Sequence, residues 1–560
     1  MAYTNILGMM ESGKRALQAQ QIATQVTGHN ISNVNTPGYS RQEAIFETTH
    51  AVDLFAVGQL GTGVRIDSVR RIHDQFLEAA VLKNMSKSAN FNTTFDYYSR
   101  IEGIFNESTT TTGISNALTE FWNSWQNLAN NTGGTAERID VREKANALVS
   151  RINRVRSDLV DLQADAESRI SPFVDKINDL GSQIADINEE IRNSTIVGDN
   201  PNDLMDKRDT LVAELSQYAG VETVNRGYYI DVKIDGNYLV YGTTHNEVEA
   251  YTNTANNDFT DLRWKATGVG ITLDSGELYA TMNARDTVIP QYMSGLDTFA
   301  QELVRNVNSL HVNGLGLTGY SSLTSDNAVS NPANALNASA LAFTPVDGSF
   351  TINVTDNLGN TVPTVINITA GVDTLNSLAT AIDAIADISA SVVNNRLVIT
   401  AAANRTFSFS GDTSNTLLAL GLNTFFSGST AADIAVNSVI AADTNKIAAA
   451  QSFSPGDNTN ALAIAALTNQ SIAALGNKSI GNYYNAQIGT LGAEAERARK
   501  DGDLYTSISI SLKNQKESIS GVSLDEEMVN LQRFQRAYEG AAKYIITVDE
   551  MIQTVLTLKS

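Results

Sequence analysis

Histidine and carboxylate side chains are the residues here whose types could support acid–base or metal chemistry. The five histidines are scattered along the chain: His29, His50, His73, His245 and His311. No two of them stand four residues apart and no HExxH motif is present, so we expect surface or packing roles for them. Adjacent carboxylates such as Glu189 and Glu190 fall in helical stretches and predict a solvated face. A general acid–base pair would instead need a pocket that shifts one pKa.

Two glycine patterns and one oxygen-rich cluster come near to ligand-binding motifs. Residues 8–14 have P-loop spacing, but Arg15 stands where the magnesium-binding Ser or Thr belongs. The glycines of residues 314–319 follow a predicted helix, whereas a dinucleotide fingerprint follows a strand. Residues 356–360 lack the closing glutamate of an EF-hand and predict a turn. The sequence therefore predicts no catalytic, cofactor-binding or metal site.

The composition narrows the class of protein. The 560 residues predict several domains, and 42% hydrophobic residues predict folded ones. A net charge of -22 argues against nucleic acid or an anionic membrane as partner. With no cysteine, disulfides and thiolate sites are excluded. The N-terminus lacks a secretory signal pattern, and no apolar run approaches the ~18 residues of a membrane span, so we expect a cytoplasmic protein or one exported without such a signal.

The last stretch, residues 522–556, carries the strongest pattern in the chain. Two series, each advancing by seven residues, form a heptad seam: Leu524, Leu531, Tyr538, Ile545 and Ile552, with Glu527, Phe534, Ala541, Val548 and Val555. Nine of these ten residues are apolar or small, and Ser523 is the expected N-cap before an acidic first turn. The spacing predicts a long helix with one apolar face.

A seam of this length favours burial, at about 25 cal/mol per Å² of apolar area, so the helix needs a partner. Residues 3–27 supply a weaker apolar stripe at the opposite end of the chain: Ile6, Met10, Ala16, Leu17, Ala23 and Val26. Two interpretations stay open. The terminal helices could pack in an ordinary core, or they could pair with each other and with copies of themselves in a polymer.

Between the two ends, helical and extended patterns alternate. A loop is expected over residues 27–42, with short strands near 43–49 and 64–72. Helices are expected over residues 73–105, 114–128 and 136–192. The last of these is expected to be a long rod kinked at Pro172. A short helix, capped by Asn202 or Asp203 and ending near Tyr218, is expected to follow it. The two Trp residues of the 114–128 helix predict core or interface packing.

Further along, residues 221–273 alternate in the manner of strands, with Asp235 and Gly236 as hairpin-turn residues. Helix returns over residues 276–311 despite Pro290. Residues 321–454 are rich in Thr, Ser, Asn, Ala and Gly and predict an inserted β-rich domain. Residues 461–474 and 483–519 are helical again.

The expected fold is multidomain, with an α-helical rod and coiled-coil core formed from both chain ends and with inserted β-rich domains, in a nested architecture. Four parts are predicted: a terminal helical domain (1–42 and 521–560), a helical rod domain with short strands (43–220, 276–320 and 455–520), a small β insertion (221–275) and a β-rich variable outer domain (321–454). Because each outer part is made from chain on both sides of an inner one, this organisation brings the termini together.

Three stretches carry a resemblance to a known family. The loop after the first helix has the family's residues Asn30, Ile31, Asn33, Gly38, Tyr39, Arg41 and Gln42. NPNDLMDKRDTLVAEL (200–215) and SGVSLDEEMVNLQRFQRAY (520–538) match two further segments, and residues 370–382 are similar to a motif of flagellin variable domains. His29 departs from the pattern, since the family often has Asn there. On these residues the chain resembles the hook-associated protein 1 family of bacterial flagella, which are hook–filament junction proteins.

The resemblance implies a structural adaptor that assembles on the hook and attaches the filament, outside the cell, after type III export without a cleaved signal peptide. It implies four kinds of partner: copies of the chain in a ring or helical homo-oligomer, hook protein, a second junction protein, and a cytoplasmic export chaperone at the C-terminal helix. The expected interface residues are Asn30, Asn33, Gly38, Tyr39, Leu524, Leu531, Phe534, Tyr538, Ile545, Val548, Ile552 and Val555. The alternatives are an exported protease or a surface adhesin carried by residues 321–454.

Overall fold

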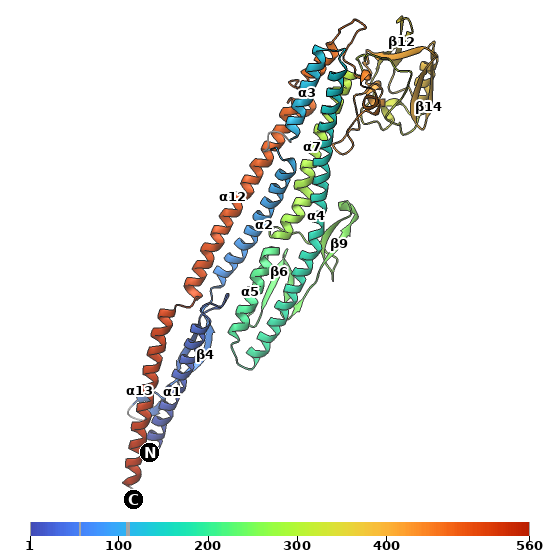
Figure 1. Ribbon diagram of the computed structural model, residues 1–560. Helices are drawn as coiled ribbons and strands as arrows, with labels where there is room; N and C mark the ends of the chain where they lie inside the picture. Colours follow the sequence, from blue (N-terminus) through green and yellow to red (C-terminus); the bar gives the residue numbers. More distant parts are fainter. Residues whose placement is uncertain (1, 55–57, 108–112, 559–560) are drawn as a thin grey trace. The chain divides into compact units, whose positions relative to one another are not determined.

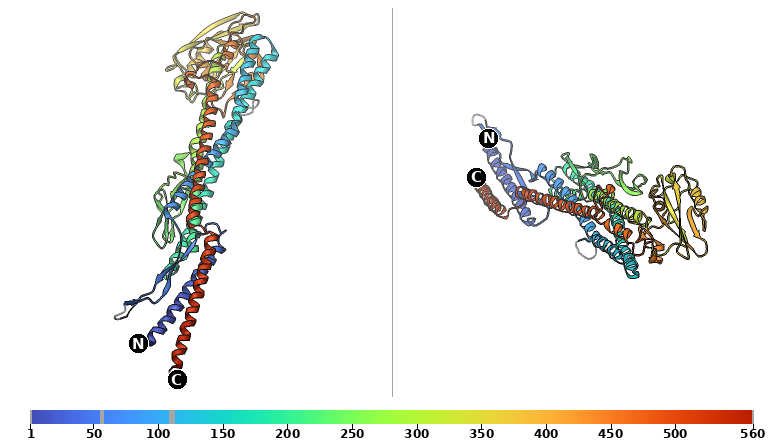
Figure 2. Two further views of the ribbon diagram at one scale, coloured as in Figure 1. Left: turned by 90° about the vertical axis from the view of Figure 1, so that its left-hand side faces the viewer. Right: turned by 90° about the horizontal axis from the view of Figure 1, so that it is seen from above.

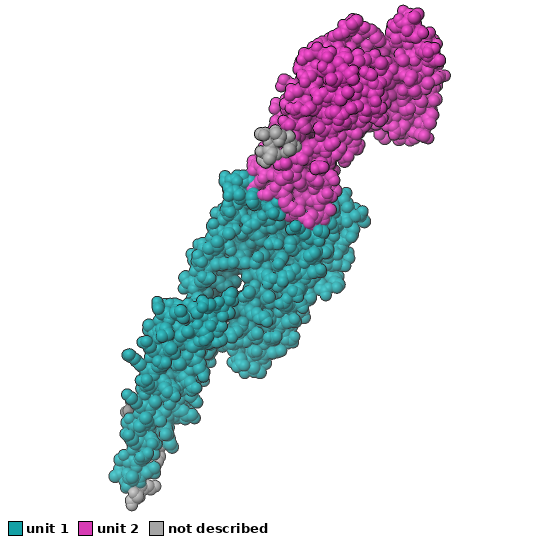
Figure 3. Space-filling view, in the orientation of Figure 1, with its two compact units in different colours: residues 1–96, 166–283, 496–560 teal, residues 97–165, 284–495 magenta. Residues whose placement is uncertain are grey.

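The computed structural model describes residues 2–54, 58–107 and 113–558, and its contacts divide into two compact units. Unit 1 comprises residues 1–96, 166–283 and 496–560, and unit 2 comprises residues 97–165 and 284–495 (Figure 3). The sequence predicts a turn at residues 108–112, between the helices expected over 73–105 and 114–128, but these residues lie outside the described part of the chain. Among the residues that are described, no helix combines the length and the apolarity needed to cross a membrane.

Helices dominate the chain (Figure 1). They are α1 (Ala2–Ser32), α2 (Gln75–Phe105), α3 (Ile114–Asn130), α4 (Thr135–Ile196), α5 (Asn202–Tyr218), α6 (Glu277–Asn283), α7 (Ile289–His311), α8 (Leu375–Asp383), α9 (Thr416–Leu420), α10 (Ser438–Ala442), α11 (Thr459–Ala466), α12 (Ile480–Ser520) and α13 (Leu524–Thr557). The division into units falls inside α2, α4 and α12.

The described strands pair in small antiparallel sheets. They are β1 (Gln42–Thr48), β2 (Val52–Leu54), β3 (Gly58–Leu60), β4 (Val64–Arg71), β5 (Glu222–Asn225), β6 (Ile230–Ile234), β7 (Asn237–Tyr241), β8 (Thr244–His245), β9 (Val248–Asn253), β10 (Phe259–Trp264), β11 (Ser322–Thr324), β12 (Gly348–Asp356), β13 (Thr361–Ile368), β14 (Ile388–Val393), β15 (Arg396–Ala401), β16 (Arg405–Ser410), β17 (Phe426–Ser427) and β18 (Ala435–Val436).

In unit 1 the two terminal helices lie side by side and run in opposite directions, so that both chain ends lie together (Figures 1 and 2). The two helices approach each other closely at Gly13, because a Cβ there would lie 2.6 Å from Cγ1 of Ile545. Phe46 of β1 also packs on Phe534 of α13, with ring centroids 5.9 Å apart. The expected pairing of the two ends within one chain is therefore observed.

The rest of unit 1 has a core between α4, α5 and the sheet β5-β6-β7-β8. Apolar residues from these elements form one buried cluster that includes Ile177, Ile184, Val212, Val232 and Leu239. The β6–β7 hairpin turns at Asp235 and Gly236, both with positive φ, as the sequence predicts.

In unit 2, the sheets β13-β12-β16 and β11-β15-β14 enclose a second core together with α8. Thr374 caps α8 in a reciprocal capping box with Ser377, which explains why a helix begins at this point. Trp122 and Trp125 of α3 are buried, and Trp125 packs on Phe425. The expected packing role of the two Trp residues is confirmed.

Two local predictions need correction, which are the start of the loop after α1 and the N-cap of α5. The expected loop at residues 27–42 begins only after Ser32, so that Asn30 belongs to the last turns of α1. Pro201, and not Asn202 or Asp203, is the N-cap of α5. Pro172 lies inside α4, which continues through it as one helix. Near Pro290, a π-helical turn at residues 284–288 precedes α7, and Pro290 falls in its first turn, where no N–H donor is required.

His311 is the last residue of α7, and its side chain is fully buried in unit 2. Its Nδ1 donates a hydrogen bond to the Asn423 carbonyl at 2.7 Å, and its Nε2 accepts one from the Ala448 N–H at 2.9 Å. Burial, together with the nearby Arg138 charge, lowers the pKa of His311 to about 4. Protonation would put a second donor against the Ala448 N–H, so the neutral ring is the folded form.

Acid should therefore weaken unit 2 through His311. Because its folded pKa lies below the unfolded value of about 6.5, its stabilising effect is complete above that value and declines as the pH falls toward 4. We expect a loss of about 3 kcal/mol of unfolding free energy over this window. Urea unfolding followed by Trp fluorescence, at both ends of the window, measures it. In H311F this component of the pH dependence should vanish, and an equally steep decline in H311F would contradict the assignment.

Candidate functional site

A polar cluster in unit 1 connects the terminal helices to the rest of that unit. We call it the joint and define it by Asn30, Ser40, Arg41, Arg71, Asp206, Asp209, Glu526 and Glu527. These residues come from α1, the loop that follows it, β4, α5 and the start of α13. Segments that are hundreds of positions apart in the sequence meet here.

Asn30 is the buried centre of the upper part of the joint. Its Oδ1 accepts hydrogen bonds from the Tyr39 hydroxyl at 2.8 Å and from the Gln42 N–H at 3.0 Å. Its Nδ2 donates to the Gln42 carbonyl at 2.9 Å and to Oε2 of Glu527 at 3.1 Å. All four hydrogen-bonding positions of the amide are thus used, so Asn30 fixes the returning loop and the first turn of α13 together.

Arg41 joins the loop to the break between α12 and α13. Its backbone N–H donates to the Ser520 carbonyl, the last residue of α12, at 2.7 Å. Its side chain contacts Glu527 through Nε at 2.8 Å and Glu526 through Nη1 at 2.8 Å. The two carboxylates lie in the first turn of α13, where the helix dipole favours negative charge.

Arg71 anchors the lower part of the joint. Its Nη1 lies 2.7 Å from Oδ1 of Asp206 and 2.7 Å from Oδ2 of Asp209, both on α5. The second oxygen of Asp206 accepts the Ser40 N–H at 2.8 Å, which connects the loop to the same ion cluster. Asp209 also pairs with Arg208 at 2.9 Å. The paired charges compensate one another in a buried setting.

Burial and neighbouring charges shift the pKa values of three groups in and beside the joint. Burial by itself raises the pKa of the Asp209 carboxyl, but Arg208, Arg71 and His73 together hold it below its usual range. Burial, followed by Arg71, lowers the pKa of His73. The pKa of Tyr39 is raised by burial and by the carboxylates of Asp203, Asp206 and Glu527, so its hydroxyl stays protonated as a donor.

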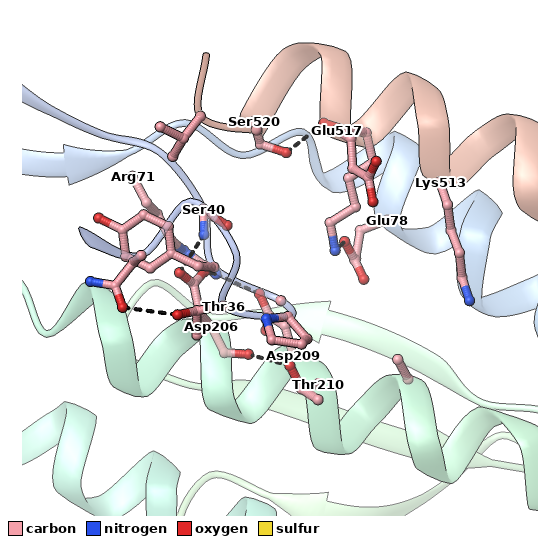
Figure 4. Close-up of a pocket in the computed structure, with 18 of the residues that line it drawn as sticks. Thr36, Ser40, Arg71, Glu78, Asp206, Asp209, Thr210, Lys513, Glu517 and Ser520 are labelled. Carbon is pink, nitrogen blue, oxygen red and sulfur yellow. Dashed lines mark hydrogen bonds and ion pairs between the residues drawn. The ribbon is translucent and has the colours of Figure 1, made fainter. Parts of the chain in front are cut away.

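A cavity of about 640 Å³ lies beside the joint (Figure 4). Loop residues such as Thr36 and Ser40 lie between α12 and α5 there, with Glu78 of α2 facing Lys516 of α12 at 2.5 Å. Gly38 is required at this place for two reasons. Its φ is +79°, and a Cβ would lie 2.6 Å from Oγ1 of Thr210.

The structure brings together three of the four expected loop residues. Asn30, Gly38 and Tyr39 contact the joint or α5, whereas Asn33 makes local contacts, its Nδ2 donating to the His29 carbonyl at 3.0 Å. The His29 ring, where the sequence departs from the family pattern, lies 3.4 Å from Asp203 and stacks edge-on against Tyr39.

Some side chains of the expected seam are buried or partly buried, and others are exposed to solvent. Val548 is buried and Leu531, Phe534, Ile545 and Ile552 are partly buried, whereas Leu524, Tyr538 and Val555 are exposed. Outside the seam, further apolar residues of α13 are exposed, with Val529 at 66% and Leu556 at 58%. Pairing with α1 therefore leaves much of the apolar surface of α13 uncovered.

Sequence reasoning missed the charged half of the joint. Arg71, Asp206, Asp209 and Glu526 did not figure among the expected site residues. A signal existed for three of them, since Asp206 and Asp209 lie in the segment 200–215 and Glu526 lies in the segment 520–538, both of which carry the resemblance. Glu527 was visible as the one charged residue in the seam.

Replacing Asn30 tests the joint directly. N30A removes four hydrogen bonds, one of them to a charged acceptor, and should lower the local unfolding free energy of the terminal helices by roughly 2–4 kcal/mol. Amide hydrogen exchange in residues 524–548 would report it. N33A is the matched control, because Asn33 is the same residue type three positions further along, just after α1, and makes local, more exposed contacts. Equal effects of the two variants would contradict the role given to Asn30.

Sequence models of three flagellar families match the chain. The model described as the flagellar hook-associated protein FlgK helical domain matches residues 98–324. The flagella basal body rod protein model matches residues 10–39, and the flagellar basal body rod FlgEFG protein C-terminal model matches residues 514–558. The latter two matches cover α1 and α13, with parts of the joint in each.

Full-length relatives are also found. Flagellar hook-associated protein 1 of Escherichia coli (strain K12) is 28% identical over 575 residues, covering 98% of this chain and 100% of the relative. The protein of the same name from Bacillus subtilis (strain 168) is 28% identical over 563 residues, covering 98% and 97%. Among solved structures, the flagellar hook junction protein FlgK from Burkholderia pseudomallei aligns with a TM-score of 0.50 at 16% identity, covering 79% of this chain and 100% of that one, which supports a similar fold.

Proposed function

We propose that this chain, which belongs to the flagellar hook-associated protein 1 family, is a structural component of the bacterial flagellum at the hook–filament junction. The observation that carries the proposal is similarity to such proteins along 98% of the chain, including both paired ends. It is a structural protein and not an enzyme, and the relatives give no support to a protease or an adhesin. Its place is the flagellum, outside the cell. Export by the type III route without a cleaved signal peptide is part of the proposal, and the cysteine-free composition suits it.

The finer architecture is also a proposal. Residues 1–42 and 521–560 would form a terminal coiled-coil domain, residues 43–220, 276–320 and 455–520 a rod domain, residues 221–275 a small β insertion and residues 321–454 a variable outer domain, nested as in flagellin. Support comes from the antiparallel pair of α1 and α13, from the heptad seam and from the separate apolar cluster around β12 and β14.

Assembly would proceed through the terminal helices. The exposed apolar residues of α13 support contacts with further copies in a ring or helical homo-oligomer, because many exposed apolar side chains on one helix favour burial against a partner. The seam residues Leu524, Tyr538 and Val555, which α1 leaves exposed, are the first candidates. Hook protein would be the neighbour on one side of the assembly and the second junction protein the neighbour on the other.

Before assembly, the same surface needs protection. We expect a cytoplasmic export chaperone to cover α13, since an amphipathic helix without its polymer partner tends to aggregate. The joint residues Asn30, Gly38 and Tyr39 would have a different role, which is to set where the two helices leave the rest of unit 1.

A strain that lacks this protein tests the proposal. Electron microscopy should show hooks without filaments, and flagellin should accumulate in the medium, because subunits are exported but have nothing to join. Expression of the full chain in the same strain should restore filaments. Normal filaments in the strain without the protein would rule out the proposed function.

A further inference from the structure

One charged side chain of the terminal helix pair, that of Glu527, is buried. Glu527 occupies a seam position of α13 that the heptad assigns to an apolar residue, yet it is 2% exposed. Among the described residues of α13, Glu527 and Val548 are the fully buried ones. A carboxylate in such a place costs free energy unless its partners are correctly placed.

Both oxygens of Glu527 have partners from the other end of the chain. Oε2 accepts from Nδ2 of Asn30 at 3.1 Å, and Oε1 accepts from Nε of Arg41 at 2.8 Å. Asn30 is itself held by Tyr39 and Gln42, so its amide cannot turn to follow a moving carboxylate. The Glu527 carboxylate therefore meets the donors of Asn30 and Arg41 at one relative position of the two helices.

The rest of the interface is less selective. Apolar and small side chains attract without direction, so a helix pair joined by them can slip by a turn, about 5.4 Å, with similar burial. At the far end of the pair, Ile545 packs against Gly13, which permits close approach but offers no directional bond. Slippage would leave Glu527 buried without its partners, at a cost that apolar contacts do not impose.

We propose that Glu527, through Asn30 and Arg41, is the residue that selects the register of α13 on α1. Single buried polar residues select register in helix pairs at the expense of stability, which is the behaviour expected here. The inference concerns the pair within one chain and goes beyond the proposed function, because it holds whatever the pair assembles with.

The absence of cysteine makes the register measurable by disulfide cross-linking in the full chain. Gly13→Cys combined with Ile545→Cys reports the observed register, since the I545C change also removes the side chain that a Cβ at position 13 would meet. Gly13→Cys combined with Ala541→Cys or with Ile552→Cys reports slippage by one turn in one direction or two turns in the other. Intrachain and interchain products separate by mass on a denaturing gel.

In the otherwise unchanged protein, the 13–545 cross-link should dominate. In E527L the shifted cross-links should rise roughly ten- to a hundred-fold relative to 13–545, the range expected for lost hydrogen bonds to a charged group. E527Q keeps an acceptor for Asn30 and should stay close to the observed register. E539L, which removes an exposed carboxylate from the same helix, is the matched control and should leave the ratio unchanged.

Two results would overturn the proposal. If E527L keeps the 13–545 product alone, apolar contacts suffice to set the register. If E527L loses all three intrachain products, Glu527 holds the helices together and does not choose between positions. E539L shifting the ratio as much as E527L would count against it as well, because any lost carboxylate would then have the same effect.

Discussion

Removal of residues 521–560 abolishes junction formation while the remaining chain stays folded. This deletion takes away α13 and, with it, both the partner of α1 and the exposed apolar residues proposed for assembly. The buried clusters of unit 2 and of α4, α5 and β5–β8 contain no residue of α13, so they should persist. Filaments counted by electron microscopy in the complemented deletion strain measure the first expectation, and circular dichroism of the purified protein measures the second.

Export is the alternative cause of such a loss, and a matched experiment separates the two. Purified protein added from outside to cells that lack it bypasses export. Full-length protein should then restore filaments, and the truncated chain should not. A chain that ends at Leu556 keeps every seam residue and should behave like the full-length protein. Normal junctions built by the chain without residues 521–560 would remove the terminal helices from the mechanism.

Replacement of Arg71 by leucine costs about 3–5 kcal/mol of the unfolding free energy of unit 1. The guanidinium is the shared partner of Asp206 and Asp209, and R71L leaves both carboxylates buried without it. Without Arg71, burial raises the pKa of the Asp209 carboxyl, so the deficit should shrink as the pH falls and this carboxyl takes up a proton. Urea denaturation at neutral and acidic pH provides the measurement.

The same strand supplies the control for Arg71. Arg65 also lies on β4 and pairs with Glu47, but its side chain is 61% exposed, against 9% for Arg71. Solvent screens an ion pair of that kind, so R65L should change stability little. If R65L and R71L were equally destabilising, charge on the strand and not the buried cluster would account for the loss.

Much of the helical content follows from local pattern. Apolar residues that recur every three or four positions bury one face of a helix whatever lies opposite, which is why α2, α3 and α12 fall close to their predicted ranges. The β6–β7 turn follows equally from Asp235 and Gly236, whose types tolerate positive φ. The heptad of the last 40 residues identifies α13 and its need for a partner.

Local pattern fails where a distant group decides the outcome. The stretch of α1 from Thr27 to Ser32 has the composition of a loop, but Asn30 receives its partners from Tyr39, Gln42 and Glu527, and the helix continues to present it to them. Asn202 is a residue type that often serves as an N-cap, but its side chain donates to the Val69 carbonyl, and Pro201 is the N-cap of α5.

The long helices and the resemblance to a flagellar family can be read from the sequence alone, because periodicity and motifs are local properties. Which charges pair depends on the tertiary structure. Asn30 and Glu527 are 497 positions apart, and Arg71 and Asp206 are 135 apart. Such contacts depend on hydrogen-bond distances of about 3 Å, which the fold sets and which no spacing along the chain encodes.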